Sequence, residues 1–145
     1  EFLNSVWESI GFSIQVEFLH EEEFKSRVSS RKYDLLFVGQ ALGYNLDTYS
    51  YWHSTQATPM GQNLSNYKSF QVDSLIEDIR YVFNLDKRKS NLKDLAKNIK
   101  EDVPAIFLYR PVYYYAPDGQ VSGVSMEDVV FSSDRFSNIS KWKFE

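Results

Sequence analysis

The clearest pattern along this chain is a pair of segments whose apolar residues recur every three or four positions. The first segment spans residues 72–83 and the second spans residues 92–103. The recurring positions are Val72, Leu75, Ile76, Ile79 and Phe83, followed by Leu92, Leu95, Ala96, Ile99 and Val103. Residues at this spacing share one face of an α-helix, so each segment predicts an amphipathic helix that buries that face.

Two different patterns in the first 40 residues predict β-strands. Residues 12–18 alternate apolar and polar side chains, which is typical of a half-buried strand, and residues 33–39 are almost continuously apolar, which is typical of a strand covered on both faces. A helix over residues 1–10, ended by Gly11, precedes the first strand, and a helix beginning at Glu21 precedes the second. This helix-strand-helix-strand order predicts an α/β fold.

Further extended segments follow the two amphipathic helices. Pro104 ends the second helix, residues 105–109 predict a strand, and residues 112–116 predict another short extended run. Pro117-Asp118-Gly119 is a strong turn sequence, after which residues 120–124 are expected to return as a hairpin. We expect the tail to pack through its apolar residues, which are Phe131, Phe136, Ile139 and Trp142.

The long segment between residues 40 and 66 has no periodicity but is rich in aromatic residues. Long loops in compact domains are usually functional or disordered, and disordered segments are poor in aromatic residues. Ligand pockets combine apolar or aromatic walls with a few orienting polar groups. The loop offers that mixture in Tyr44, Asp47, Tyr51, Trp52 and Asn63.

Composition narrows the classes of partner and cofactor. The chain has 145 residues, which suits one domain, and its net charge of −4 disfavours nucleic acid and anionic membranes as partners. Four lysines on the second amphipathic helix form a stripe that acidic residues interrupt, so we interpret it as a solvated face. These lysines are Lys89, Lys93, Lys97 and Lys100.

The inventory of reactive side chains predicts neither a metal nor a cofactor. There is no cysteine, and two histidines cannot build a three-histidine site. Neither His20 beside Glu21–Glu23 nor His53 with Asp47 has a second histidine at metal-ligand spacing. No glycine-rich phosphate-binding motif occurs.

Two alternatives to a ligand-binding protein remain open. A small serine hydrolase could use Ser54 or Ser65 with His53 and either of two aspartates, Asp47 or Asp73. No Gly-x-Ser-x-Gly elbow is present to expose such a serine, so we predict that the chain is not an enzyme. The other alternative is a non-catalytic interaction domain that binds a protein through exposed tyrosines.

The order of several short motifs resembles one known family. The main block runs from Gly61 to Tyr109 and contains, in order, Asn63, Ser65, Asn66 and Tyr67, then Val72-Asp73-Ser74-Leu75-Ile76, Arg88, and Asp102-Val103-Pro104-Ala105-Ile106-Phe107-Leu108-Tyr109. Two shorter motifs precede this block. They are Trp7-Glu8-Ser9-Ile10-Gly11, and Arg31-Lys32-Tyr33-Asp34 followed by Gly39. This order is similar to that of the C-terminal lobe of family 5 extracellular solute-binding proteins, the peptide and nickel receptors of ABC importers.

The resemblance implies a fold, a function and a location. It implies a periplasmic-binding-protein type II lobe, with a mixed sheet and helices on both faces. Residues 1–145 would then be one domain, the C-terminal lobe fragment of a larger two-lobe protein whose N-terminal lobe is missing. The function implied is binding of a peptide or another small solute for an ABC permease in the membrane. The location implied is extracytoplasmic, with a lipid anchor on the full-length protein.

The resemblance also places the ligand site by position. Gly39, Gln40, Ala41, Gly43 and Tyr44 would line the cleft, and Asp47, Trp52 and Asn63 complete the predicted site. Peptide receptors of the family have a tryptophan where this chain has Gln40, and an aspartate that pairs with the peptide amino terminus where it has Gly43. Either Asp47 replaces that carboxylate, or the ligand has no free amino terminus.

Overall fold

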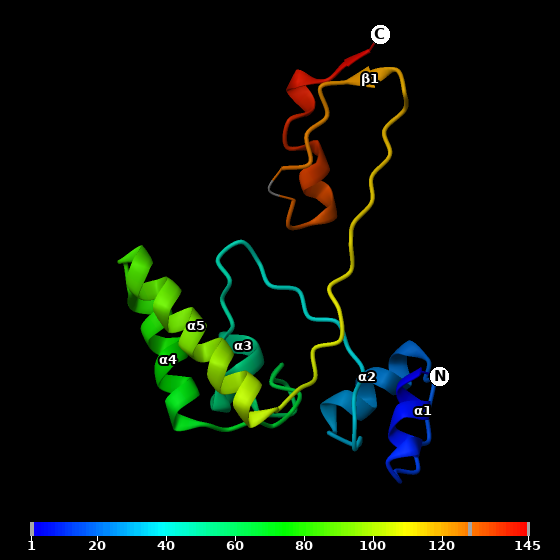
Figure 1. Ribbon diagram of the computed structural model, residues 1–145, viewed down its shortest axis with the longest axis vertical. Helices are drawn as coiled ribbons and strands as arrows, with labels where there is room; N and C mark the ends of the chain where they lie inside the picture. The colour runs from blue at the N-terminus through cyan, green and yellow to red at the C-terminus, as the bar shows by residue number, and fades with distance from the viewer. Residues whose placement is uncertain (1, 128, 145) are drawn as a thin grey trace. The chain divides into compact units, whose positions relative to one another are not determined.

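The computed structural model describes residues 2–127 and 129–144 (Figure 1). Among these described residues, 44% are helical and only 3% belong to strands, so this part of the protein is mostly helical. Its contacts group it into two compact units, residues 1–37 and residues 38–145. The two units are described separately.

The first unit contains two of the expected helices. Helix α1 spans Phe2–Ser9 and helix α2 spans Glu21–Ser29. Gly11 follows α1 with a φ of +94°, the left-handed conformation in which glycine commonly ends a helix. Three glutamates occupy the first turn of α2, where negative charge is favoured by the helix dipole. Both helices are therefore confirmed, although Phe2–Ser9 and Glu21–Ser29 contain no buried residue.

The two strands expected in this part of the chain were predicted wrongly. Residues 12–18 and the described residues 33–39 form no β-ladder. Their apolar side chains are largely exposed; Phe18, for example, is 96% exposed and Phe37 is 69% exposed. An extended segment becomes a strand only when a neighbour takes up its N–H and C=O groups, and alternation of side chains cannot supply that neighbour.

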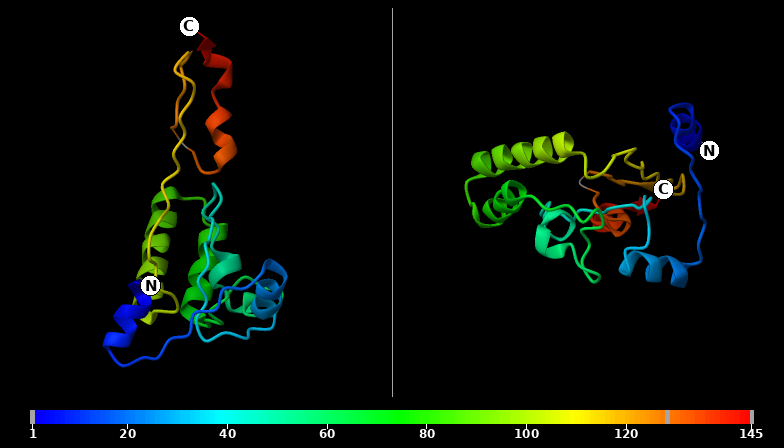
Figure 2. Two further views of the ribbon diagram at one scale, coloured as in Figure 1. Left: turned by 90° about the vertical axis from the view of Figure 1, so that its right-hand side faces the viewer. Right: turned by 90° about the horizontal axis from the view of Figure 1, so that it is seen from below.

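The core of the second unit is built on the two amphipathic helices. Helix α4 spans Phe70–Tyr81 and helix α5 spans Leu85–Asp102, and the two lie side by side (Figures 1 and 2). Side-chain oxygens of Ser69 and Asn84 accept a backbone N–H in the first turn of α4 and α5, respectively. The buried core consists of Trp52, Val72, Ile76, Ile79, Leu95 and Ile99.

Three residues assigned to the inner faces of these helices are exposed: Phe83, Ala96 and Val103. Phe83 is 98% exposed because α4 ends at Tyr81 and the chain becomes extended at Val82. Val103 is 60% exposed and has a φ of +49°, a left-handed conformation at the end of α5. The following Pro104 disfavours helical backbone at Val103, so the helical pattern stops one residue before its last apolar position.

The segment between residues 40 and 66 contains two short helices that periodicity did not predict. Helix α3 spans Tyr49–Trp52 and the 3-10 helix η1 spans Ser54–Gln56. Trp52 projects into the core, where it is 7% exposed. Elements of one turn are too short to show a repeating pattern in the sequence, so the segment resembled an irregular loop.

Gly61 is required by a close approach within this segment. A Cβ atom at position 61 would lie 1.9 Å from the backbone oxygen of Gln56, whereas a Cβ at Gly119 would meet nothing within 4 Å. We expect Gly61→Ala to lower the free energy of unfolding by about 1 to 3 kcal/mol, because the backbone must move to relieve the clash. Gly119→Ala is the matched control and should change it by less than about 0.5 kcal/mol. Urea denaturation of both variants checks the difference, and equal stabilities would contradict this packing.

The C-terminal part of the second unit carries the only ladder among the described residues. Strand β1, Val121–Ser122, pairs antiparallel with strand β2, Lys143–Phe144. The prediction that residues 120–124 return as a hairpin after the Pro117-Asp118-Gly119 turn is therefore wrong. A turn does occur there, but it runs from Asp118 to Val121, whose N–H donates to the backbone oxygen of Asp118 at 3.0 Å. The 3-10 helices η2, Ser132–Phe136, and η3, Ile139–Lys141, lie between the strands in sequence. The tail packs partly as expected, through rings such as Phe136 against Trp142 at 5.8 Å.

The predicted α/β architecture is contradicted by these observations. A mixed sheet with helices on both faces, as in a periplasmic-binding-protein type II lobe, is not seen in residues 2–127 and 129–144. Residues 105–109 and 112–116, which were expected to be extended, form no ladder either. The helices were predictable from local spacing, but a sheet depends on pairing between segments far apart in sequence.

Candidate functional site

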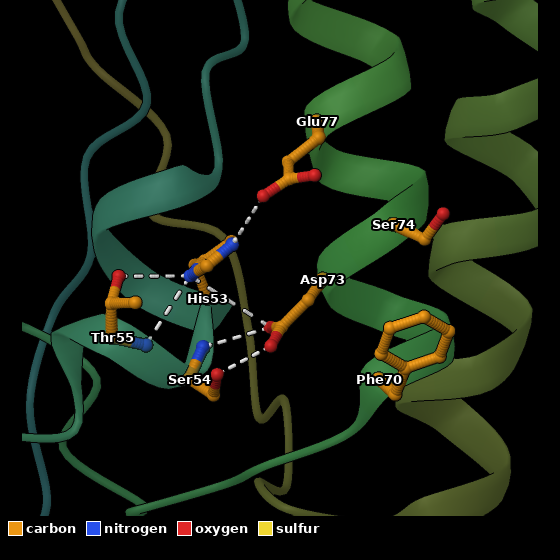
Figure 3. A pocket seen from close by; sticks show the side chains of 7 residues that line it. All are labelled: His53, Ser54, Thr55, Phe70, Asp73, Ser74 and Glu77. Carbon is orange, nitrogen blue, oxygen red and sulfur yellow. Dashed lines mark hydrogen bonds and ion pairs between the residues drawn. The ribbon is translucent and has the colours of Figure 1, made fainter.

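A hollow of about 290 Å³ lies where α3 and η1 meet α4 (Figure 3). The α3–η1 segment contributes three lining residues and α4 contributes four. They are His53, Ser54 and Thr55, and Phe70, Asp73, Ser74 and Glu77. No lysine or arginine is among these seven described residues. Two carboxylates and one imidazole therefore dominate the electrostatics of the hollow.

His53 is the most deeply buried titratable group in this hollow, with 5% of its surface exposed. Its Nδ1 accepts a hydrogen bond from the backbone N of Thr55 at 3.2 Å, and Nε2 lies 3.3 Å from Oε1 of Glu77. Its ring stacks on Tyr49 with centroids 4.2 Å apart. Because Nδ1 is an acceptor, the neutral ring carries its hydrogen on Nε2 and donates it to Glu77.

Asp73 fastens η1 to α4. Its Oδ1 accepts the backbone N–H of Ser54 at 2.8 Å, and its Oδ2 accepts the hydroxyl of the same serine. In a serine hydrolase the hydroxyl instead donates to the imidazole, which the carboxylate orients through the other ring nitrogen. Here the carboxylate takes the hydroxyl directly, and the nearest ring nitrogen, Nδ1, is 3.9 Å from Oδ1. This arrangement can hold the loop against α4, but it lacks the serine-imidazole-carboxylate sequence of hydrogen bonds through which a serine hydrolase passes a proton.

Asn63 is fully buried, and its side chain organises the loop that contains it. Its Nδ2 donates to the backbone oxygens of His53 at 3.1 Å and Tyr67 at 2.8 Å. Its Oδ1 accepts from the backbone N of Tyr67 at 3.1 Å and from the Ser65 hydroxyl at 3.3 Å. With 0% of its surface exposed, Asn63 supports the loop from inside. Its predicted contact with a ligand stays a prediction.

Tyr67 connects this loop to the end of α5. Its hydroxyl donates to a carboxylate oxygen of Asp102. The pKa of Tyr67 is raised above its ordinary value, first by burial and then by this hydrogen bond. The phenol therefore keeps its proton and remains a donor at neutral pH. The Tyr67–Asp102 hydrogen bond thereby holds the loop against the end of α5.

The predicted cleft residues before α3 lie in an exposed stretch of the second unit. Gly39, Gln40 and Ala41 are exposed, and Gly43 is half-buried. Tyr51, which the sequence placed among the aromatic wall, donates its hydroxyl to the backbone oxygen of Ala41 at 2.9 Å. The stretch therefore has at least one anchor to α3 while leaving its backbone accessible.

Tyr44 contacts the C-terminal part of the same unit. Its hydroxyl donates to Oδ1 of Asp134 at 2.5 Å, and its ring meets Phe131 edge-on with centroids 5.3 Å apart. Backbone hydrogen bonding from Phe131, followed by the bond from Tyr44, holds the pKa of Asp134 below its ordinary value. The bond to Asp134 in turn raises the pKa of Tyr44. Phenol and carboxylate thus stay in the donor and acceptor forms that their contact requires.

Asp47 and Trp52, the remaining predicted site residues, have other partners. Oδ2 of Asp47 lies 3.4 Å from Nε of Arg80, and its Oδ1 accepts the backbone N–H of Tyr49 at 3.0 Å. Trp52 belongs to the core. None of the eight predicted ligand-binding residues lines the hollow around His53; these are Gly39, Gln40, Ala41, Gly43, Tyr44, Asp47, Trp52 and Asn63.

Some residues of this hollow were identified from the sequence, but as candidates for a hydrolase active site. His53, Ser54 and Asp73 were considered as hydrolase residues, whereas Thr55, Phe70, Ser74 and Glu77 were not proposed as site residues. One available signal was the spacing of Asp73 and Glu77, because residues four apart share a helix face. That spacing does not reveal which segment faces the two carboxylates. The described residues also contain no group of three or more potential metal ligands of the His, Cys, Asp or Glu type placed to hold an ion.

Comparison with known proteins found no match for the chain among family models, curated proteins or solved structures. Within the described part of the chain, no helix combines the length and apolar character needed to cross a membrane.

Proposed function

We propose that this chain belongs to the extracytoplasmic receptor of an ABC importer and binds a peptide or a similar small solute without transforming it. The observation that carries the proposal is the mutual contact of the residues on which the family resemblance rests. Asn63 bonds Tyr67, Tyr67 bonds Asp102, and Val72 and Ile76 pack with α5 in one core. Because these motif residues contact one another in the folded chain, their shared order supports common descent with the family better than isolated matches would.

The proposal rests on this block and not on the family's sheet, which is not seen in the described part of the chain. Its partners would be the permease and the other lobe of a two-lobe receptor, at the outer face of a membrane. The arrangement at Ser54 and Asp73 favours binding over hydrolysis, because the serine hydroxyl is held by a carboxylate and not by a base that could pass its proton onward.

The contacts of Asp47 refine the chemistry expected of the ligand. Its carboxylate is already paired with Arg80, and both groups are partly exposed. A charged peptide amino terminus in the cleft would therefore have to compete with Arg80 for this carboxylate, and leaving a charge unpaired is costly. We infer that the ligand does not rely on a free amino terminus.

Calorimetry of the complete receptor, with pooled peptides of two to eight residues, tests the proposal. A ligand that binds only the folded state stabilises it by about 2.7 kcal/mol at a concentration 100 times Kd. We expect peptide pools to raise Tm, amino-terminal acetylation to preserve the rise, and mass spectrometry to recover the peptides intact. Gln40→Ala should reduce the rise, whereas Gln120→Ala, at an exposed turn, should not.

Three outcomes would count against the proposal. If no peptide or small-solute pool raised Tm, the receptor assignment would fail. Hydrolysis of esters or peptides that disappears in Ser54→Ala would favour the enzyme alternative. A rise in Tm that only free amino termini produce would overturn the inference about Asp47 alone.

A further inference from the structure

The starting point is the way His53 joins two elements in its neutral state. The ring accepts the backbone N–H of Thr55 within η1 and faces Glu77 on α4 with its other nitrogen. The imidazole therefore caps η1 on one side and contacts α4 on the other. A change at either ring nitrogen must alter one of these connections.

Protonation of the ring would place a hydrogen on Nδ1, where the Thr55 N–H now points. Two N–H groups cannot hydrogen-bond to each other, so the bond to the Thr55 amide would be lost. The new hydrogen could be donated to Oγ1 of Thr55, which lies 2.9 Å from Nδ1. The positive ring would also be attracted to the carboxylates of Asp73 and Glu77, at 3.9 Å and 3.3 Å from its nitrogens.

The charges around His53 come mostly from α4. Asp73 and Glu77 attract a positive ring, whereas Arg80 on the same helix opposes it. Arg80 lies with its guanidinium carbon 4.5 Å from the centroid of the Tyr49 ring, on which His53 stacks, and its charge is partly offset by Asp47. The neighbouring groups on α3 and η1 are the hydroxyls of Tyr49 and Thr55, whose oxygens lie 3.0 Å apart.

We propose that the junction of η1 and α4 is a pH-dependent switch, in which protonation of His53 releases the Thr55 amide and replaces that bond by charged contacts with Glu77 and Asp73. The Ser54 bonds to Asp73 keep η1 attached to α4 in both states. The backbone oxygen of His53 also accepts Nδ2 of Asn63, which connects the switch to the loop that Asn63 organises. This inference does not depend on the proposed transport function.

Nuclear magnetic resonance between pH 8 and pH 5 tests the switch on the intact chain. We expect the ring signals of His53 and the amide of Thr55 to change with one common midpoint. Amide hydrogen exchange at Thr55, corrected for its intrinsic pH dependence, should become about fivefold faster in the acid form, as expected for the loss of one hydrogen bond.

Two isosteric variants distinguish the direct contact between Glu77 and the charged ring from the general effect of removing one negative charge from α4. Glu77→Gln keeps an oxygen that can accept from Nε2 but removes the negative charge, so the midpoint should move down by about 0.5 to 1 pH unit. Asp78→Asn removes the same charge at the adjacent, exposed position of α4. It should move the midpoint by no more than about 0.2 pH unit because of solvent screening.

The results that would overturn the switch are equally specific. If the Thr55 amide shows no pH response, or responds with a midpoint different from that of His53, the amide is not coupled to the ring. Equal shifts in Glu77→Gln and Asp78→Asn would show that Glu77 makes no special contact with the charged ring. A Thr55 response that persists in His53→Gln would assign it to another group.

Discussion

Ile76→Ala is expected to lower the free energy of unfolding of the second unit by about 2 to 5 kcal/mol. Ile76 is 1% exposed and lies in the core that α4 and α5 share. Truncation removes buried methyl groups and leaves a cavity that packed helices fill only partly. Urea denaturation followed by circular dichroism measures the loss, and Ile76→Val should lose about 0.5 to 1.5 kcal/mol if the alanine variant is too unstable to study.

Phe83→Ala is the matched control for this prediction. The heptad-like pattern places Phe83 on the same face as Ile76, but its side chain is 98% exposed. Its replacement should change stability by less than about 0.5 kcal/mol. If Phe83→Ala destabilised the protein as strongly as Ile76→Ala, α4 would have to continue past Tyr81 and the packing described above would be wrong.

Asn63→Ala is expected to lower the free energy of unfolding by about 2 to 4 kcal/mol, although Asn63 is a polar residue in a loop. Its removal would take away the hydrogen bonds that Asn63 makes to the backbone oxygen and N–H of Tyr67. The backbone oxygen of His53 would lose one of its two donors and keep the N–H of Gln56 at 3.0 Å. Each buried polar group left unsatisfied costs about 1 to 3 kcal/mol, and water entering the site would recover part of this. Thermal and urea unfolding measure the effect.

Two variants control for the chemistry of this side chain. Asn63→Asp keeps an acceptor for Tyr67 N but turns an oxygen toward two backbone carbonyls, so it should destabilise the protein about as much as alanine does. Asn98→Ala removes an amide that bonds only the Asp94 carbonyl of its own helix at an exposed contact, and should cost less than about 0.5 kcal/mol. A stable Asn63→Ala variant with weakened ligand binding would instead favour the ligand contact predicted from the sequence.

The parts of the fold that could be predicted from the sequence are those that neighbouring residues determine. The faces of α4 and α5 follow from spacings of three and four residues, and Gly11 ends α1 through its own backbone freedom. The ends of α4 and α5 were less predictable, because Phe83 and Val103 continue the apolar pattern beyond the point where the backbone leaves the helix.

The candidate site was harder to predict because its geometry depends on contacts across the chain. Asn63 resembles a ligand-orienting residue when only its neighbours in sequence are considered, yet its side-chain hydrogen bonds go to the loop's own backbone and to Ser65. Glu77 is unremarkable on α4 until His53 is placed opposite it. Strand propensity in residues 12–18 and 33–39 could not predict pairing, because the pairing partner is not encoded locally.

Residues 105–109 and 112–115 have a consequence for how this protein behaves at high concentration. Both are runs of apolar and aromatic residues that lie largely exposed and outside any β-ladder in the described structure. Exposed runs of this kind are templates for aggregation, and natural sequences interrupt them with charges and prolines. Arg110 and Pro111 separate the two runs. The charge of Arg110 and the ring of Pro111 therefore interrupt what would otherwise be one long exposed apolar run, which lowers its tendency to aggregate.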